Sequence, residues 1–239
     1  MTIRSTVFAV GSLLAVVTAL ASPAGAQTVP SPYRFIEGRQ EVSLLSGYMP
    51  ADPGIYDLGP RSGPLFGARY TFEAAGPIFF EGLLSYVPTD RAVIDPRRAR
   101  DDWSIGDTDV HLVMLDARVD FSLTGRRTWR RISPHLFVGG GLAVDLATEG
   151  EREQELLPED LFDFGTVFTA NAGTGLRVSL TSKLMLRADA GMTLWKINTP
   201  GGFQDPTKRP PTDGGEQENL RRGEWVAGTG LALSLGWRF

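Results

Sequence analysis

The sequence predicts an all-β protein: an eight-stranded antiparallel up-and-down transmembrane β-barrel with short periplasmic turns and long outer loops. Three observations predict this fold. Long stretches of the chain alternate apolar and polar residues with a period of two, as half-buried strands do. The connections between these stretches alternate between long and short. The chain also ends on a long regular alternation, at Phe239.

The C-terminal strand has the clearest register. From Trp225 to Phe239, the odd positions are mostly apolar and begin and end on aromatic residues. The even positions are mostly small or polar. The alternation covers 15 residues, whereas a tilted strand crosses a bilayer in about 9–11 residues. We therefore expect the odd positions of this strand to face lipid.

Seven earlier segments repeat the alternation. They lie at about 41–48, 66–72, 79–86, 111–121, 136–144, 168–180 and 184–194. The register of the first segment stays open, because Val42, Leu44 and Leu45 place apolar side chains on both of its faces. With the C-terminal strand, these segments make eight strands.

The connections between the strands are of two kinds. Short ones are expected at 74–77, 124–131 and 181–183, and long ones at 49–63, 88–106, 147–163 and 198–224. Strict alternation is typical of barrels with periplasmic turns and outer loops, and it places both termini on the periplasmic side. Bilayer hydrocarbon offers no partner to an unpaired backbone group, so an amphipathic sheet there must close on itself. Eight strands is about the smallest closure that side chains can fill.

The N-terminal residues predict a signal peptide over residues 1–26. Arg4 precedes an uncharged apolar run from Thr6 to Ala21, and Ala24 and Ala26 form a small-x-small cleavage site. The alternative is a membrane anchor, but the run of 16 residues is shorter than the roughly 20 of a spanning helix. We expect a short lead-in at 27–38 and the barrel at 39–239. The chain has no cysteine, and a closed barrel needs no disulfide to hold its ends together.

The hairpin from Gly173 to Asp189 and the terminal segment Leu235–Phe239, together with the four long loops, resemble the outer-membrane β-barrel family related to the OmpA and OmpX transmembrane domains. The resemblance covers about 39–239 and implies a location in the cell outer membrane. It also implies that the barrel-assembly machinery reads the last strand as an insertion signal, through Leu233, Leu235, Trp237 and Phe239. Because the chain ends at Phe239, no C-terminal peptidoglycan-binding domain is expected.

Charged residues occupy the predicted inner face of the barrel. They are Arg69, Glu81, Asp116, Arg118, Asp120, Arg177, Arg187 and Asp189. Buried charges must be paired and hydrogen-bonded. We therefore expect a lumen charge network that plugs a polar interior. The alternative is a gated polar conduit, which a ring of eight strands leaves little room for.

The two histidines are the other candidates for chemistry. His111 is expected on the outward face near the outer rim, and His135 on the inward face near the periplasmic rim. A lipid hydrolase or acyltransferase would pair His111 with a serine such as Ser104. No hydrolase signature surrounds it, and nearness in sequence is weak evidence for a triad. We expect no catalytic residues and no cofactor.

The predicted outer loops carry many charges. The acidic ones are Asp101, Asp102, Asp107, Asp109, Glu149, Glu151, Glu153, Glu155, Glu159 and Asp160. Their spacing matches no calcium loop, so we expect solvated charges and no metal site. Candidates to pair with lipid phosphates are Arg97, Arg98, Arg100, Arg221 and Arg222. The net charge of −4 argues against nucleic-acid binding.

These observations predict a monomeric barrel with a structural or surface-interaction role and a plugged lumen. Its expected partners are outer-membrane lipids and lipopolysaccharide, together with the barrel-assembly machinery during biogenesis. Two alternatives remain. The first is a narrow channel or transporter for small or hydrophobic solutes, and the second is an outer-membrane lipid-modifying enzyme.

Overall fold

The computed structural model describes residues 31–205, 207 and 220–239. The predicted signal peptide, its cleavage residues Ala24 and Ala26, and the first part of the lead-in lie outside the described residues. The unit from Pro32 to Phe239 is described below. None of its helices is both long and apolar enough to cross a membrane.

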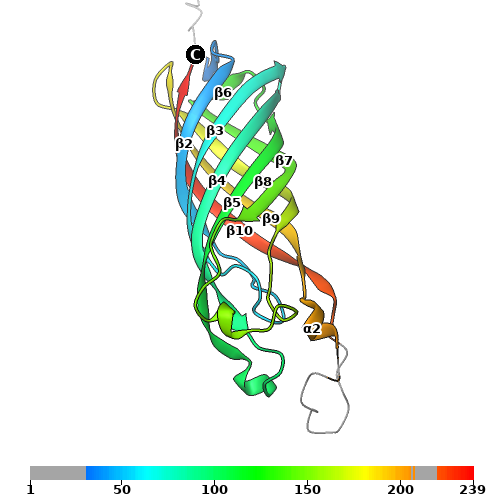
Figure 1. Cartoon of the computed structure of the whole chain (residues 1–239). Coiled ribbons are helices and arrows are strands. Elements are labelled where there is room, and N and C mark those ends of the chain that lie inside the picture. The colour runs from blue at the N-terminus through cyan, green and yellow to red at the C-terminus, as the bar shows by residue number, and fades with distance from the viewer. Residues whose placement is uncertain (1–30, 206, 208–219) are drawn as a thin grey trace, which may run out of the picture. The chain divides into compact units, whose positions relative to one another are not determined.

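Eight strands form a closed antiparallel ring (Figure 1). The strands are β2 (Gln40–Met49), β3 (Gly63–Ala75), β4 (Ile78–Ile94), β5 (Ser104–Ser122), β7 (Ile132–Asp145), β8 (Thr166–Ser179), β9 (Leu184–Asn198) and β10 (Gly223–Arg238). Each pairs with the next, and β10 returns to β2 from Leu231↔Tyr48 to Arg238↔Glu41. The predicted eight-stranded up-and-down barrel is therefore confirmed.

Two three-residue strands lie outside the ring. β1 (Tyr33–Phe35) belongs to the lead-in and pairs with β6 (Arg127–Trp129), which lies in the connection between β5 and β7. β6 forms a tight hairpin with β7 through Trp129↔Ile132. β7 is four strands away from β2 around the ring. The lead-in therefore crosses the mouth of the barrel before β2 begins. Three residues are too few to show a period, so the sequence did not predict these strands.

The described parts of the outer loops contain three short helical turns. They are η1 (Arg100–Asp102), η2 (Glu153–Glu155) and α2 (Gly201–Gln204). The long loops lie at one end of the barrel, and the short turns and the C-terminus lie at the other (Figure 1).

The outward face is apolar on every strand, as its exposed large side chains show. The first strand's register, left open by the sequence, is settled: Val42 and Leu44 are 45% and 69% exposed, whereas Leu45 is 6% exposed. On β10, Leu233, Leu235 and Trp237 point outward, as predicted for the odd-numbered positions of this strand.

The prediction of one long loop over 88–106 is wrong. β4 and β5 remain paired up to Ile94↔Ser104, and the connection is only 95–103. The predicted loop begins at Pro88, which has no N–H to donate to a neighbouring strand. However, β3 pairs with β4 only as far as Phe66↔Tyr86. Beyond that point β4 is an edge strand, where a missing donor is tolerated.

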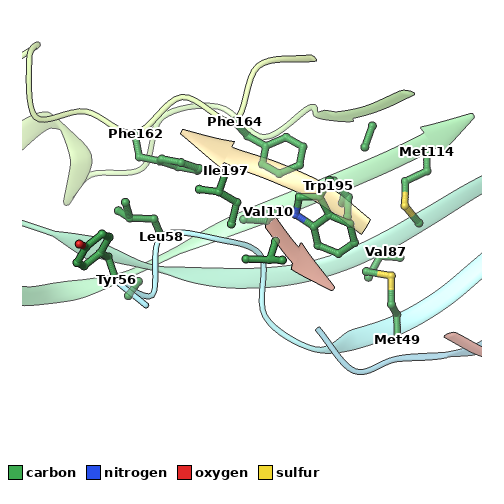
Figure 2. Packing of buried hydrophobic residues seen from close by; sticks show 14 of the residues in the cluster. Met49, Tyr56, Leu58, Val87, Val110, Met114, Phe162, Phe164, Trp195 and Ile197 are labelled. Carbon is green, nitrogen blue, oxygen red and sulfur yellow. The ribbon is translucent and has the colours of Figure 1, made fainter. Parts of the chain in front are cut away.

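The interior differs from the predicted polar lumen in its outer half. An apolar cluster fills that half, and we call it the outer core. Its strand residues are Leu45, Met49, Leu65, Leu83, Val87, Ala92, Ile94, Val110, Leu112, Met114, Ala143, Trp195, Ile197 and Val226. Its loop residues are Tyr56, Leu58, Phe162, Phe164, Phe203 and Leu220. Figure 2 shows Phe162 and Phe164 lying over Ile197 and Trp195. The outer loops fold back over the strand ends, so inward apolar side chains gain partners there.

Candidate functional site: the charge network in the barrel

The periplasmic half of the barrel holds the predicted charges, and we call this part the ionic layer. All eight residues lie inside the barrel: Arg69, Glu81, Asp116, Arg118, Asp120, Arg177, Arg187 and Asp189. They come from β3, β4, β5, β8 and β9, whose inward positions converge at this level. Four arginines face four carboxylates, so the network is balanced in formal charge.

Arg187 is the centre of the ionic layer. Its side chain is 0% exposed and contacts three carboxylates. The Nη1 atom lies 2.7 Å from Glu81, Nε lies 2.8 Å from Asp189, and Nη2 lies 3.3 Å from Asp120. Each contact uses a different nitrogen of one planar fork, a geometry that lysine does not offer.

The other arginines extend the network to the barrel wall. Arg69 places Nη2 2.6 Å from Asp189 and Nε 3.2 Å from Glu81. Arg118 lies 3.3 Å from Asp116, and its guanidinium covers the Phe137 ring at 4.8 Å.

Arg177 lies at the periplasmic edge of the network. Its Nη2 atom donates to Asp120 at 2.8 Å, and its guanidinium covers Phe79 at 5.2 Å. Asp116 also accepts hydrogen bonds from Thr169 at 3.0 Å and Asn171 at 2.9 Å. Satisfied carboxylates of this kind are the condition for burying ions at tolerable cost.

Three further residues join the layer that the sequence did not assign to it. His135 is fully buried, with Nε2 2.9 Å from Asp189 and 3.6 Å from Asp120. Arg238 lies 3.4 Å from Glu41, nearer the periplasmic end of the barrel. The alternation in β10 already placed Arg238, an even-numbered position, on the inward face. His135 was also expected to face inward. Glu41 was hidden by the open register of the first strand.

Two glycines make room for this crowding. A Cβ at Gly175 would collide with the Asp189 carboxylate and lie 2.6 Å from Cε1 of His135. A Cβ at Gly191 would lie 2.7 Å from Cζ of Phe137. The inward glycines of β8 and β9 therefore let large side chains from other strands cross the lumen.

A small cavity separates the ionic layer from the outer core. Leu45, Leu65 and Met114 line one side of it, and Arg69 and Asp189 line the other. Its volume is only ≈ 50 Å³. A few water molecules fit such a space, since each needs roughly 10–15 Å³.

The loop charges are more ordered than the sequence predicted. Glu153 and Asp160, expected to be solvated, are 5% and 1% exposed. Glu153 pairs with Arg91, and Asp160 accepts a hydrogen bond from Nε of Arg97 at 2.7 Å. That hydrogen bond raises the pKa of Arg97. Arg97, a candidate for lipid phosphates, is thus occupied within the chain. Long side chains from β4 and from the β4–β5 loop bury these carboxylates, which spacing along the sequence does not reveal.

The structure does not bring His111 and Ser104 together. Both lie on β5, seven residues apart, which corresponds to about 23 Å along a strand. His111 is exposed on the outward face, and its Nδ1 lies 2.8 Å from the hydroxyl of Tyr86. Within the described residues, no group of three potential metal ligands is gathered.

No family model matches the chain, and no curated protein matches it. Several solved structures do. The outer membrane protein OprG from Pseudomonas aeruginosa is 11% identical, with a TM-score of 0.51 over 84% of this chain and 97% of that one. Neisserial surface protein A is 14% identical, with a TM-score of 0.48 over 84% and 97%. Escherichia coli outer membrane protein W is 15% identical, with a TM-score of 0.41 over 84% and 98%.

At these identities the likeness is one of fold, and the match to OprG carries it. The likeness agrees with the closed ring, the apolar outward face and the charged interior half, which together describe a barrel surrounded by lipid. The chain therefore has the fold of an eight-stranded transmembrane β-barrel, the fold it shares with OprG.

Proposed function

We propose that the protein is a closed, non-conducting barrel that stabilises the outer membrane and presents its outer loops as an ordered contact surface. The observation that carries this proposal is the ionic layer. Arg187, Glu81 and Asp120 are bonded across the lumen with side chains that are all 0% exposed. A continuous water path past them would require several buried ion pairs to separate at once.

The outer end supports the second part of the proposal. Arg61 bridges Asp90 at 2.7 Å and Asp107 at 2.8 Å, which ties the loop after β2 to the β4–β5 hairpin. Arg97 ties that hairpin to Asp160 in the next loop. Loops held by such ties and by the outer core offer a preorganised surface, which lowers the entropic cost of binding a partner.

Conductance in planar bilayers tests the closed lumen. We expect no stepwise increases in current from the wild-type protein under conditions in which a general porin conducts. The double variant Arg187→Ala, Asp120→Ala removes two facing ions with no net charge change, and it should admit a small current. Arg152→Ala with Glu155→Ala, an exposed outer pair, is the matched control and should stay silent. Reproducible steps from the wild type would overturn the proposal.

A second candidate function is a narrow path for small or hydrophobic solutes. The outer core favours it, because apolar side chains line the interior from the loops down to the cavity above Arg69. Uptake of an apolar dye into vesicles separates the two candidates. Uptake that depends on the protein and is blocked by Ala232→Trp, placed in the wall of the cavity, would favour transport.

We also propose that membrane lipids and lipopolysaccharide surround the barrel, and that the assembly machinery reads Leu233, Leu235, Trp237 and Phe239. The first three side chains form an exposed row on one face of β10, and Phe239 follows them. Phe239→Ala should reduce the heat-modifiable folded form in cells, whereas Phe168→Ala, which removes another outward aromatic side chain, should not. Equal losses would remove the special role of the last residue.

A further inference from the structure

The periplasmic mouth contains a second pocket, separate from the lumen cavity. The lead-in, β6, the β8–β9 turn and the end of β10 enclose it. Its volume is ≈ 250 Å³, compared with ≈ 50 Å³ for the cavity inside the barrel. The pocket exists because β1 pairs with β6 and holds the lead-in across the mouth.

Three arginines line this pocket: Arg34, Arg131 and Arg238. Glu37 is the one carboxylate among the lining residues. Arg238 has Glu41 at 3.4 Å. Arg34 and Arg131 are exposed and form no ion pair within the described part of the chain. Arg131 Nη1 donates one long hydrogen bond to the Leu180 carbonyl at 3.5 Å, and its other N–H groups remain for a ligand. The pocket therefore has a surplus of positive charge.

Hydroxyl groups complete the lining. Ser179, Thr181 and Ser182 contribute them, whereas the hydroxyl of buried Thr128 donates to the Arg34 carbonyl at 3.5 Å. The Thr181 hydroxyl accepts the backbone N–H of Leu184 at 2.9 Å, which leaves its own proton to donate. Guanidinium and hydroxyl donors converging on one space are the chemistry that binds phosphate oxygens.

The turn that supplies Arg131 is conformationally unusual. Arg130 and Arg131 have φ angles of 50° and 74°, and they form the two-residue loop between Trp129 and Ile132. Such loops favour Asn-Gly or Gly-Gly because both positions need positive φ. Backbone bonds hold the turn: Arg130 N–H donates to Pro32 at 2.9 Å, and Ser179 N–H donates to Arg131 at 2.9 Å. Two arginines at positions suited to glycine are unfavourable for folding, which points to a use for a side chain there.

One wall of the pocket reaches the lipid-facing rim. Leu180 lines it, is 42% exposed, and continues the outward positions of β8. Exposed Phe35 lines the pocket from β1. Trp129, 46% exposed, ends β6 directly before the Arg130-Arg131 turn. Exposed aromatics at this level are typical of a membrane–water interface. A ligand with a phosphate next to an acyl chain matches both walls.

We propose that this pocket binds the phosphate of an anionic phospholipid from the periplasmic leaflet, through Arg34 and Arg131. Bound lipid fastens the lead-in to the β6–β7 turn and closes the mouth beneath the ionic layer. This site is independent of the proposed outer surface and of whether the lumen conducts.

Native mass spectrometry of the folded, detergent-extracted protein tests the site with phosphatidylglycerol as the probe. The wild type should retain one phosphatidylglycerol molecule and release phosphatidylcholine. Arg34→Gln and Arg131→Gln should each weaken retention by about tenfold, which corresponds to one charge-assisted contact. Arg127→Gln is the matched control, because Arg127 is exposed on the same hairpin but does not line the pocket.

Three outcomes overturn the proposal. Equal loss in Arg127→Gln would indicate general surface charge. Full displacement of the lipid by millimolar inorganic phosphate would indicate a site for a soluble anion. Retention unchanged in both Arg34→Gln and Arg131→Gln would exclude the pocket. Heat-modifiable migration of each variant verifies that the barrel remains folded, and Arg131→Gly, which relieves the φ angle while removing the guanidinium, should still lose the lipid.

Discussion

The ionic layer and the outer core fill the same barrel by opposite means. In the ionic layer, four arginines and four carboxylates neutralise one another within a few ångströms, and Arg187 alone contacts three acids. In the outer core, Trp195, Leu112 and Val110 pack among other apolar side chains. The first filling depends on orientation and on matched charge, whereas the second depends on volume.

This contrast teaches what each half tolerates. Buried ions are held by specific atoms, so a residue of the same charge but different shape loses the contacts. Apolar side chains are held by dispersion and exclusion from water, so a residue of similar volume keeps most of the stability. Substitutions that preserve charge in one half and volume in the other should therefore separate the two regions.

The largest effect is expected at Arg187. Arg187→Ala leaves Glu81, Asp120 and Asp189 with too little positive charge, and we expect a loss of about 3–5 kcal/mol in the free energy of unfolding. Arg187→Lys should recover little of it, because an ammonium group does not reach three acids at once. Urea titration of the barrel in lipid vesicles measures both. Recovery of most of the stability by lysine would contradict the proposed role of the guanidinium fork.

A somewhat smaller effect is expected at Leu112, a fully buried residue of the outer core. Leu112→Ala should cost about 2–5 kcal/mol through lost contacts and the cavity left behind. Leu112→Met, which nearly conserves volume, should cost less than about 1.5 kcal/mol. The same titration gives both values. If Leu112→Met lowers the stability as much as Leu112→Ala, the outer core depends on exact side-chain shape as strictly as the ionic layer does.

The two regions also differ in how far the sequence could reveal them. The ring and most of its parity followed from alternation, because lipid and lumen impose opposite polarity on successive residues. The inward charges were legible for the same reason. The outer core could not be predicted, because positions such as Leu65 and Met114 are apolar residues with apolar neighbours in the sequence, so the alternation is lost there. Its covering residues, such as Phe162 and Phe203, come from loops whose return path depends on tertiary contacts.

The structure of the periplasmic mouth was the hardest part to predict from the sequence. β1 and β6 have three residues each, which is less than two full periods of alternation. Their pairing is long-range, between the lead-in and a turn, and no local pattern encodes it. The sequence also does not indicate the positive φ angles of Arg130 and Arg131, because arginine rarely adopts positive φ, whereas glycine does so readily.

The smallest effect is expected at that turn, outside both fillings of the barrel. Arg130→Gly removes the strain of a side chain at φ 50° but makes the unfolded chain more flexible, so the gain in stability should be at most about 1 kcal/mol. Arg130 covers the Trp129 ring at 5.3 Å, and losing that contact reduces the gain further. Arg131→Gly should behave alike in urea titration of lipid-free micelles. In vesicles rich in phosphatidylglycerol the two variants should diverge, since Arg131 lines the pocket and Arg130 does not. A stability difference that is the same with and without the anionic lipid would assign both arginines to the turn alone.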